Sequence, residues 1–171
     1  VFDAQAMADR LSHILMRNTD QANNMMLNLL DSHDTERFLT LAKKNGKDER
    51  SLLCSLAIMF FLPGMPCIYY GTEIGMEGGY DPDCRRTFDW NRKNWNMRVY
   101  ATVINLIRLR KCIKGDVTYS AENGILLIGR GDLILAVNNG TEKRRTKILH
   151  KEYEIGPFEF IIINIKEGEV L

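Results

Sequence analysis

The sequence predicts a chain in two parts, an α/β part followed by an all-β part. Helix-like and strand-like apolar patterns alternate from Phe2 to about Cys112. After Gly115 the chain consists of short β-rich runs separated by turns rich in glycine and asparagine. A group of polar side chains follows each strand-like run of the first part. We therefore expect parallel α/β structure in residues 1–113 and a small antiparallel sheet or sandwich in residues 114–171.

The first part opens with a helix and a strand. The apolar residues of "FDAQAMADRLSHIL", among them Phe2, recur near one helical face, and Asp3 can cap the helix. The apolar run "NMMLNLL" then predicts a buried strand that ends at Asp31 or Ser32. The polar stretch "KKNGKDE" that comes later predicts a surface connection.

A second helix and strand follow from Glu49. The run "RSLLCSLAIMFFL" is apolar nearly all round, which predicts a helix buried on most sides, and Pro63 and Gly64 end it. The run "CIYYG" predicts a strand. The stretch from Thr72 to Trp95 has no periodicity, so we expect a long loop of the kind that often serves function.

The last helix and the β runs complete the chain. The run "NMRVYATVINLIRLRK" is amphipathic and places basic residues in its last turn, where they favour the helix dipole. Gly115 is the expected stop. The predicted strands beyond it are "VTYSA", "ILLIG", "LILAVNN", "TKILH" and "FEFIIINI".

Composition excludes some classes of partner. The 23 basic and 22 acidic residues nearly cancel, so no overall field favours nucleic acid or an anionic membrane. The four cysteines form no CxxC or zinc-type spacing, which predicts reduced and mostly packed thiols. The apolar stretch around "LAIMFFL" is shorter than the roughly 20 residues of a membrane span, and no signal-peptide pattern opens the sequence.

Two polar segments are candidates for a functional site. In "NLLDSHDTERF" the His33–Asp34 pair follows the first strand, where it could be catalytic or could form a turn with local backbone hydrogen bonds. In "GMPCIYYGTEIGMEGGYDPDCRR" the second strand leads to Asp81 and Arg85. Because parallel strands end at the same edge of a sheet, we expect the two segments to meet.

Together these two segments resemble the α-amylase family of glycoside hydrolases, and within it the cyclomaltodextrinase, neopullulanase and maltogenic amylase group. The resemblance implies that residues 1–113 are the last part of a (β/α)8 TIM barrel, from helix six to helix eight, and that residues 114–171 are the C-terminal β domain. It implies a hydrolase that cleaves α-1,4-glucosidic bonds of cyclodextrins, pullulan, starch or maltooligosaccharides with retention. It implies an α-glucan substrate, no cofactor in this segment and a cytoplasmic location.

The resemblance also implies roles for individual residues. Asp34 matches the family's transition-state stabiliser, and His33 matches the histidine that donates to the same sugar. Asp81 and Arg85 match residues of the neighbouring glycone-side subsites, although a structural salt bridge between them is the alternative. Arg37 is expected to orient the turn by ion pairing. Thr72 stands where many relatives carry Asp.

The aromatic residues near the segments leave two interpretations open. Tyr69 and Tyr70 could stack on sugar rings, but core packing is the favoured interpretation. Trp90 and Trp95 are expected to be packing anchors rather than a binding platform.

The family's nucleophile and acid/base motifs are not found in this sequence. The resemblance therefore implies a piece that is inactive alone, whose exposed barrel strands could support a homo-oligomer. A metal-dependent phosphohydrolase is a weak alternative because the sequence has only three histidines. A non-catalytic sugar-binding or interaction relative, such as a transporter heavy chain, is another alternative.

Overall fold

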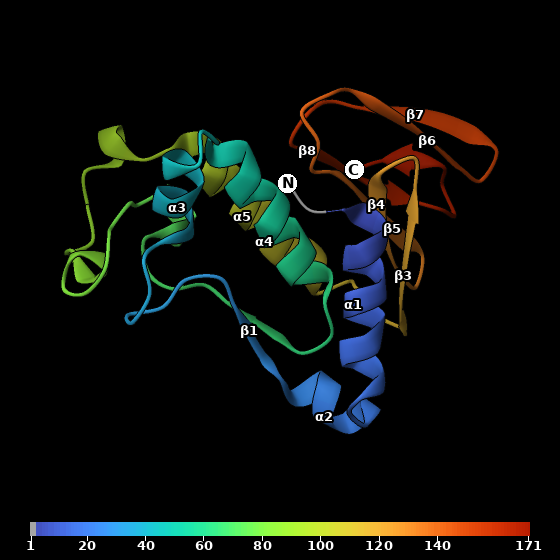
Figure 1. The fold of residues 1–171 in the computed structure, drawn as a ribbon, viewed down its shortest axis with the longest axis horizontal. Helices are drawn as coiled ribbons and strands as arrows, with labels where there is room; N and C mark the ends of the chain where they lie inside the picture. The colour runs from blue at the N-terminus through green and yellow to red at the C-terminus, as the bar shows by residue number, and fades with distance from the viewer. Residues whose placement is uncertain (1–2) are drawn as a thin grey trace.

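The computed structural model describes residues 3–171, in which helices and a short parallel sheet precede a larger antiparallel sheet. Helix α1 (Ala4–Met16) begins after Asp3, whose carboxylate accepts from the Ala6 N–H at 2.8 Å. This confirms the predicted helix and its cap. Phe2, which the pattern places on the apolar face, lies outside the described residues. Helix α1 lies along strand β3 of the antiparallel sheet (Figure 1).

A parallel pair of strands forms the edge from which the candidate segments leave. Strand β1 (Leu27–Leu29) pairs with β2 (Met65–Cys67) in parallel. The expectation of a buried β1 is wrong for this structure, because Leu27 is 58% exposed and Leu29 is 50% exposed. Among the described residues β1 pairs only with β2, so the outer edge of each strand has no strand neighbour. Strand β2 also begins and ends earlier than the run "CIYYG" predicts.

Two further helices lie beside this pair. Helix α4 (Glu49–Phe61) is buried along most of its surface, as predicted. Helix α5 (Met97–Arg110) packs against α4, and both stand between the long loop and the antiparallel sheet (Figure 1). Two short helices were not predicted: α2 (Asp20–Met25) precedes β1, and α3 (Phe38–Lys44) follows it. The long loop contains three single-turn 3-10 helices, η1 (Thr72–Ile74), η2 (Asp83–Arg85) and η3 (Arg92–Asn94).

The second part is antiparallel β structure, as expected. One sheet has the order β3-β4-β5-β8-β9. Its strands are β3 (Val117–Glu122), β4 (Ile125–Arg130), β5 (Leu133–Asn138), β8 (Glu159–Asn164) and β9 (Glu169–Val170). Strands β6 (Arg144–Ile148) and β7 (Lys151–Ile155) form a hairpin. Leu149 and His150 have φ values of 47° and 67° in its tight turn, so the predicted strand "TKILH" ends before them.

The core is continuous between the helices and the five-stranded sheet. Apolar residues of α1, α4 and α5 pack with residues of β4, β5 and β8 in one cluster. A second, smaller cluster lies between this sheet and the β6–β7 hairpin. Helices α1 and α4 therefore both join the first part to the sheet. No helix among residues 3–171 is long and apolar enough to cross a membrane.

Removal of one side chain at the centre of α4 tests this core. Leu56 is fully buried, and we expect Leu56→Ala to lower the free energy of unfolding by about 2–5 kcal/mol, because it deletes packed methyl groups and leaves a cavity. Urea unfolding would measure the loss. The control is Met16→Ala on α1, where the side chain is 85% exposed and the expected change is within about 0.5 kcal/mol. Equal losses for the two variants would contradict the placement of Leu56 in the packed core.

Candidate active site

The loop after β1 is fixed by Asp31, a buried residue that the sequence did not single out beyond marking the strand end. Its carboxylate accepts from the Phe38 N–H at 2.6 Å and from the Thr72 hydroxyl at 2.6 Å. The first contact ties the start of α3 to the end of β1, and the second ties η1 to the same point. The Asp31 carboxylate therefore joins the segments that follow β1 and β2.

The four predicted site residues meet beyond this junction. His33 Nε2 lies 3.2 Å from Asp34 Oδ1, and Arg85 Nη2 lies 3.9 Å from the same oxygen. Arg85 Nε lies 2.9 Å from Asp81 Oδ1 and donates to the His33 carbonyl at 3.1 Å. The structure thus brings His33, Asp34, Asp81 and Arg85 into one cluster. The side chains of His33 and Asp34 are 63% and 69% exposed, so a ligand in solvent can reach both.

The loop that supplies Asp81 and Arg85 is held by its own hydrogen bonds. The peptide bond between Asp81 and Pro82 is cis. Asp83 accepts from the Gly79 N–H at 2.6 Å and from Arg86 Nη2 at 2.9 Å. These contacts, with the Arg86 hydrogen bond the larger cause, hold the pKa of Asp83 below its ordinary value. The carboxylate of Asp83 therefore stabilises the loop in its ionised form.

Arg37 lies beneath the cluster, in an environment different from the one we expected. The prediction that it forms an ion pair is wrong, because no acidic partner lies within salt-bridge distance among the described residues. Its guanidinium donates instead to the Tyr70 carbonyl at 2.9 Å and to the Cys84 carbonyl at 3.1 Å. The guanidinium carbon also lies 4.7 Å and 5.1 Å from the ring centres of Tyr69 and Tyr70. Backbone carbonyls and aromatic faces are the partners of this charge in place of a carboxylate.

Of the aromatic residues near the cluster, some pack against neighbouring groups and one is largely exposed to solvent. The rings of Tyr69 and Tyr70 lie 4.6 Å apart, and the Tyr70 hydroxyl donates to the Arg86 carbonyl. Trp95 donates to the Asp89 carbonyl at 2.7 Å and packs at a tilt against the Tyr100 ring, as expected of a packing anchor. Trp90 is 82% exposed and is therefore not an anchor, although its ring meets Phe88 edge-on.

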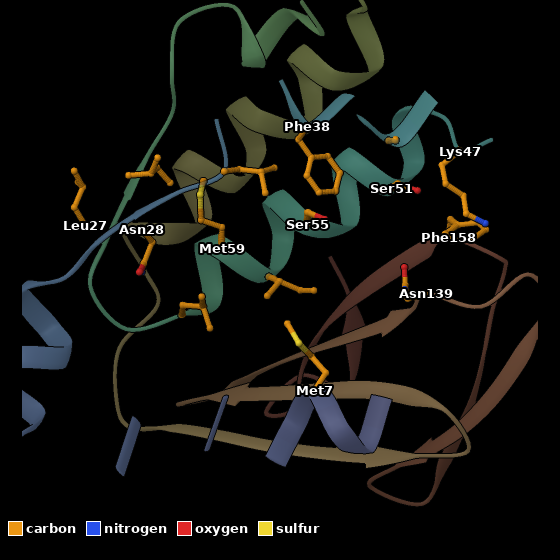
Figure 2. Close-up of a pocket in the computed structure, with 15 residues that line it drawn as sticks. Met7, Leu27, Asn28, Phe38, Lys47, Ser51, Ser55, Met59, Asn139 and Phe158 are labelled. Carbon is orange, nitrogen blue, oxygen red and sulfur yellow. The ribbon is translucent and has the colours of Figure 1, made fainter. Parts of the chain in front are cut away.

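The described part of the chain also contains a cavity of about 680 Å³ that lies apart from the polar cluster. Figure 2 shows that Ser51, Ser55 and Met59 of α4 approach it from one side and Met7 of α1 from another. None of the four predicted site residues lines it. Within residues 3–171, no group of three or more His, Cys, Asp or Glu residues is placed to hold a metal ion.

Comparison with known proteins gives a consistent set of similarities. Residues 2–116 match the family described as Alpha amylase, catalytic domain. The chain is 47% identical over 108 residues to the intracellular maltogenic amylase of Bacillus subtilis, a match that covers 63% of this chain and 18% of that protein. It is 39% identical over 146 residues to the cyclomaltodextrinase of Thermoanaerobacter pseudethanolicus, with 80% of this chain and 25% of that protein covered.

A solved structure matches the fold as well. The chain superposes on the cyclic α-maltosyl-(1→6)-maltose hydrolase of Arthrobacter globiformis in complex with maltose, with a TM-score of 0.84 and 28% identity. That match covers 95% of this chain and 40% of the other chain. The chain therefore spans only about a fifth to a quarter of the length of the two curated relatives and two fifths of this structure.

The hydrogen bonds of Asp83 predict a response to acid. A carboxyl group whose pKa is lower in the folded state contributes stability above about pH 4 and loses it as the pH falls through the folded-state value. We expect Asp83→Asn to reduce the dependence of the free energy of unfolding on pH below about pH 4. Urea unfolding at a series of pH values would measure it. Asp116→Asn, at an exposed position with no salt bridge, should keep the original dependence, and an unchanged curve for Asp83→Asn would contradict the prediction.

Proposed function

Since the chain belongs to the α-amylase family of glycoside hydrolases, we propose that it is part of a retaining α-glucan hydrolase. The proposed substrates are cyclodextrins, pullulan, starch or maltooligosaccharides, cleaved at α-1,4-glucosidic bonds. This proposal is supported by the names of two relatives, a maltogenic amylase and a cyclomaltodextrinase. The proposed location is the cytoplasm, on the basis of the relative that is named as intracellular.

The observation that supports the proposal best is the convergence of Asp34, His33, Asp81 and Arg85 at the ends of β1 and β2. The cluster combines carboxylates, which accept from sugar hydroxyls, with an imidazole and a guanidinium, which donate to them. All four side chains are about half exposed or more. This arrangement suits a ligand that presents many hydroxyl groups and no charge.

We assign Asp34 to stabilisation of the transition state. Glycoside hydrolysis passes through an oxocarbenium-like transition state, and hydrogen bonds to the sugar hydroxyls strengthen as positive charge develops on the ring. An ionised carboxylate is a strong acceptor for such bonds. His33, 3.2 Å from Asp34, would donate to the same sugar.

Asp81 and Arg85 would bind the adjoining glycone-side sugar. Their ion pair of 2.9 Å leaves a carboxylate oxygen and guanidinium donors for hydroxyl groups. The same pair shapes the loop, so the two interpretations from the sequence are compatible. Arg85 also orients the His33 carbonyl, which couples the two subsites.

The remaining parts of the reaction would come from residues outside this chain. Retaining glycosidases need a nucleophile and an acid/base whose carboxyl groups lie about 5–5.5 Å apart, and the family's motifs for both are not found in this sequence. We propose that residues 1–113 complete a (β/α)8 barrel and that residues 114–171 form its C-terminal β domain. The half-exposed Leu27 and Leu29 support association of β1 with further strands or with a second copy.

The role of Asp34 predicts the effect of an isosteric change. In the full-length protein that we propose contains this chain, Asp34→Asn should lower kcat on β-cyclodextrin by about 10²- to 10³-fold, because the neutral amide cannot stabilise the developing charge. Asp132→Asn is the matched control, since Asp132 pairs with Lys166 in the antiparallel part. If the wild-type protein hydrolyses none of the α-glucans offered, the proposed hydrolase function is wrong, and the alternative of a non-catalytic sugar-binding or interaction protein is favoured.

The chain alone is predicted to have no hydrolase activity. Without the nucleophile and the acid/base, we expect residues 1–171 to release no product from a chromogenic maltoside. The measurement compares this chain with the full-length protein at equal molar concentration. If the purified chain turns over the maltoside and Asp34→Asn abolishes that turnover, a nucleophile and an acid/base from outside this chain are not required.

A further inference from the structure

We propose that Arg37 is a positioning residue, which fixes His33 and Asp34 relative to the loop after β2 without touching substrate. This inference rests on the proposed function, because it concerns the geometry of the same cluster. The sequence led us to expect that Arg37 orients the turn by ion pairing; in the structure its partners are backbone carbonyls and tyrosine rings of the other loop instead.

The environment of Arg37 is unusual for a charged side chain. Arg37 is 0% exposed, and its Nη2 has no hydrogen-bond partner among the described residues. A buried charge without a carboxylate is costly to desolvate, so neutral partners must compensate for the lost water. Here the partners are two backbone carbonyls and two tyrosine rings.

Those partners belong to the segments that must stay aligned. Arg37 lies three residues after Asp34 in the loop that follows β1. Its guanidinium contacts Tyr70 and Cys84, which both lie in the segment that follows β2. Its own N–H donates to the Gly78 carbonyl at 3.0 Å. The side chain and backbone N–H of Arg37 therefore bind the loop after β1 to three carbonyls of the segment after β2, and we call this set of contacts the clamp.

The clamp continues to the site through Cys84. The Cys84 thiol is fully buried, and its Sγ lies 3.0 Å from the His33 carbonyl, to which it donates. The same carbonyl accepts from Arg85 Nε at 3.1 Å. Arg37 thus holds the backbone of Cys84, and Cys84 with Arg85 holds the peptide that joins His33 to Asp34.

This chain of contacts matters because the two site side chains are themselves exposed. Asp34 is 69% exposed at its side chain, so packing does not fix its position. Its alignment depends on the backbone below and on its neighbours His33 and Arg85. A misplacement of about 1 Å in a catalytic group can cost about 10²-fold in rate, so a residue that only aligns the backbone can control turnover.

The test compares Arg37 with another buried arginine. Arg130 is 8% exposed and also donates to backbone carbonyls, those of Phe61 and Leu62, but in the antiparallel part of the chain. In the full-length protein we expect Arg37→Met to lower kcat on β-cyclodextrin by about 10- to 100-fold with a smaller rise in KM. Arg130→Met should lose stability but keep kcat, measured on the folded fraction. Arg37→Lys, which keeps one donor group, should recover part of the lost kcat.

A second pair of variants tests the hydrogen bond from the Cys84 thiol to the His33 carbonyl. It keeps the inference testable if Arg37→Met does not fold. Cys84→Ala should lower kcat by about three- to tenfold, because one weak hydrogen bond to the His33 carbonyl is removed. Cys54→Ala is the control: Cys54 lies buried in α4, where burial raises the pKa of its thiol to about 12, and it does not contact the cluster.

The outcomes separate this inference from the proposed function. If Asp34→Asn abolishes turnover while the Arg37 and Cys84 variants behave like their controls, the function stands and the positioning role is overturned. If Asp34→Asn leaves turnover unchanged, the proposed function itself is wrong. Losses of kcat in the Arg37 and Cys84 variants that their controls do not show, with partial recovery by Arg37→Lys, support the positioning role.

Discussion

The site depends on the parallel pairing of β1 with β2. In this register Leu27 faces Met65 and Leu29 faces Cys67, so both strands end at the same edge of the sheet. Gly64 permits this close approach: its φ is +93°, and a Cβ at this position would lie 2.4 Å from the Met26 carbonyl oxygen. The Met65 N–H donates to that same carbonyl at 2.7 Å. A larger residue at position 64 would therefore shift β2 and separate the two site loops.

The same edge is braced by polar contacts of two kinds. Asp31 holds the ends of the strands together through the Phe38 N–H and the Thr72 hydroxyl. Further along the loops the contacts come from a cation, because the Arg37 guanidinium donates to carbonyls of the second loop. A carboxylate only accepts hydrogen bonds, so it can bind N–H and O–H groups. A guanidinium only donates, so it can bind several carbonyls that would otherwise have no partner. The two residues together satisfy both kinds of buried backbone group.

The sequence predicted the long elements because their signals are local. Helix α1 has a capping Asp3, and α4 and α5 have apolar patterns that extend over several turns. Helix α3 was missed because it is short and its N-cap, Arg37, forms no side-chain capping bond. The exposure of β1 was also missed, since the apolar run indicates a strand but not the number of its neighbours.

The polar cluster was predictable in its members but not in its support. The motif around Asp34 and the loop around Arg85 pointed to these residues, and the parallel order of the strands implied that they meet. The partners of Arg37 are main-chain carbonyls, which every residue has, so no residue type in the sequence marks them. The contact between the Cys84 thiol and the His33 carbonyl joins positions far apart in the sequence and arises only from the fold.

The exposed strands and the ordered cluster have different physical origins. Leu27, Leu29 and Met65 are half exposed because apolar coverage of a sheet needs neighbouring elements. The polar cluster is held by hydrogen bonds between two loops of this chain, so its geometry does not depend on that coverage. These residues can thus be aligned before any further strand is added. Hydrolysis with retention would still require a nucleophile and an acid/base carboxyl group in addition to this cluster.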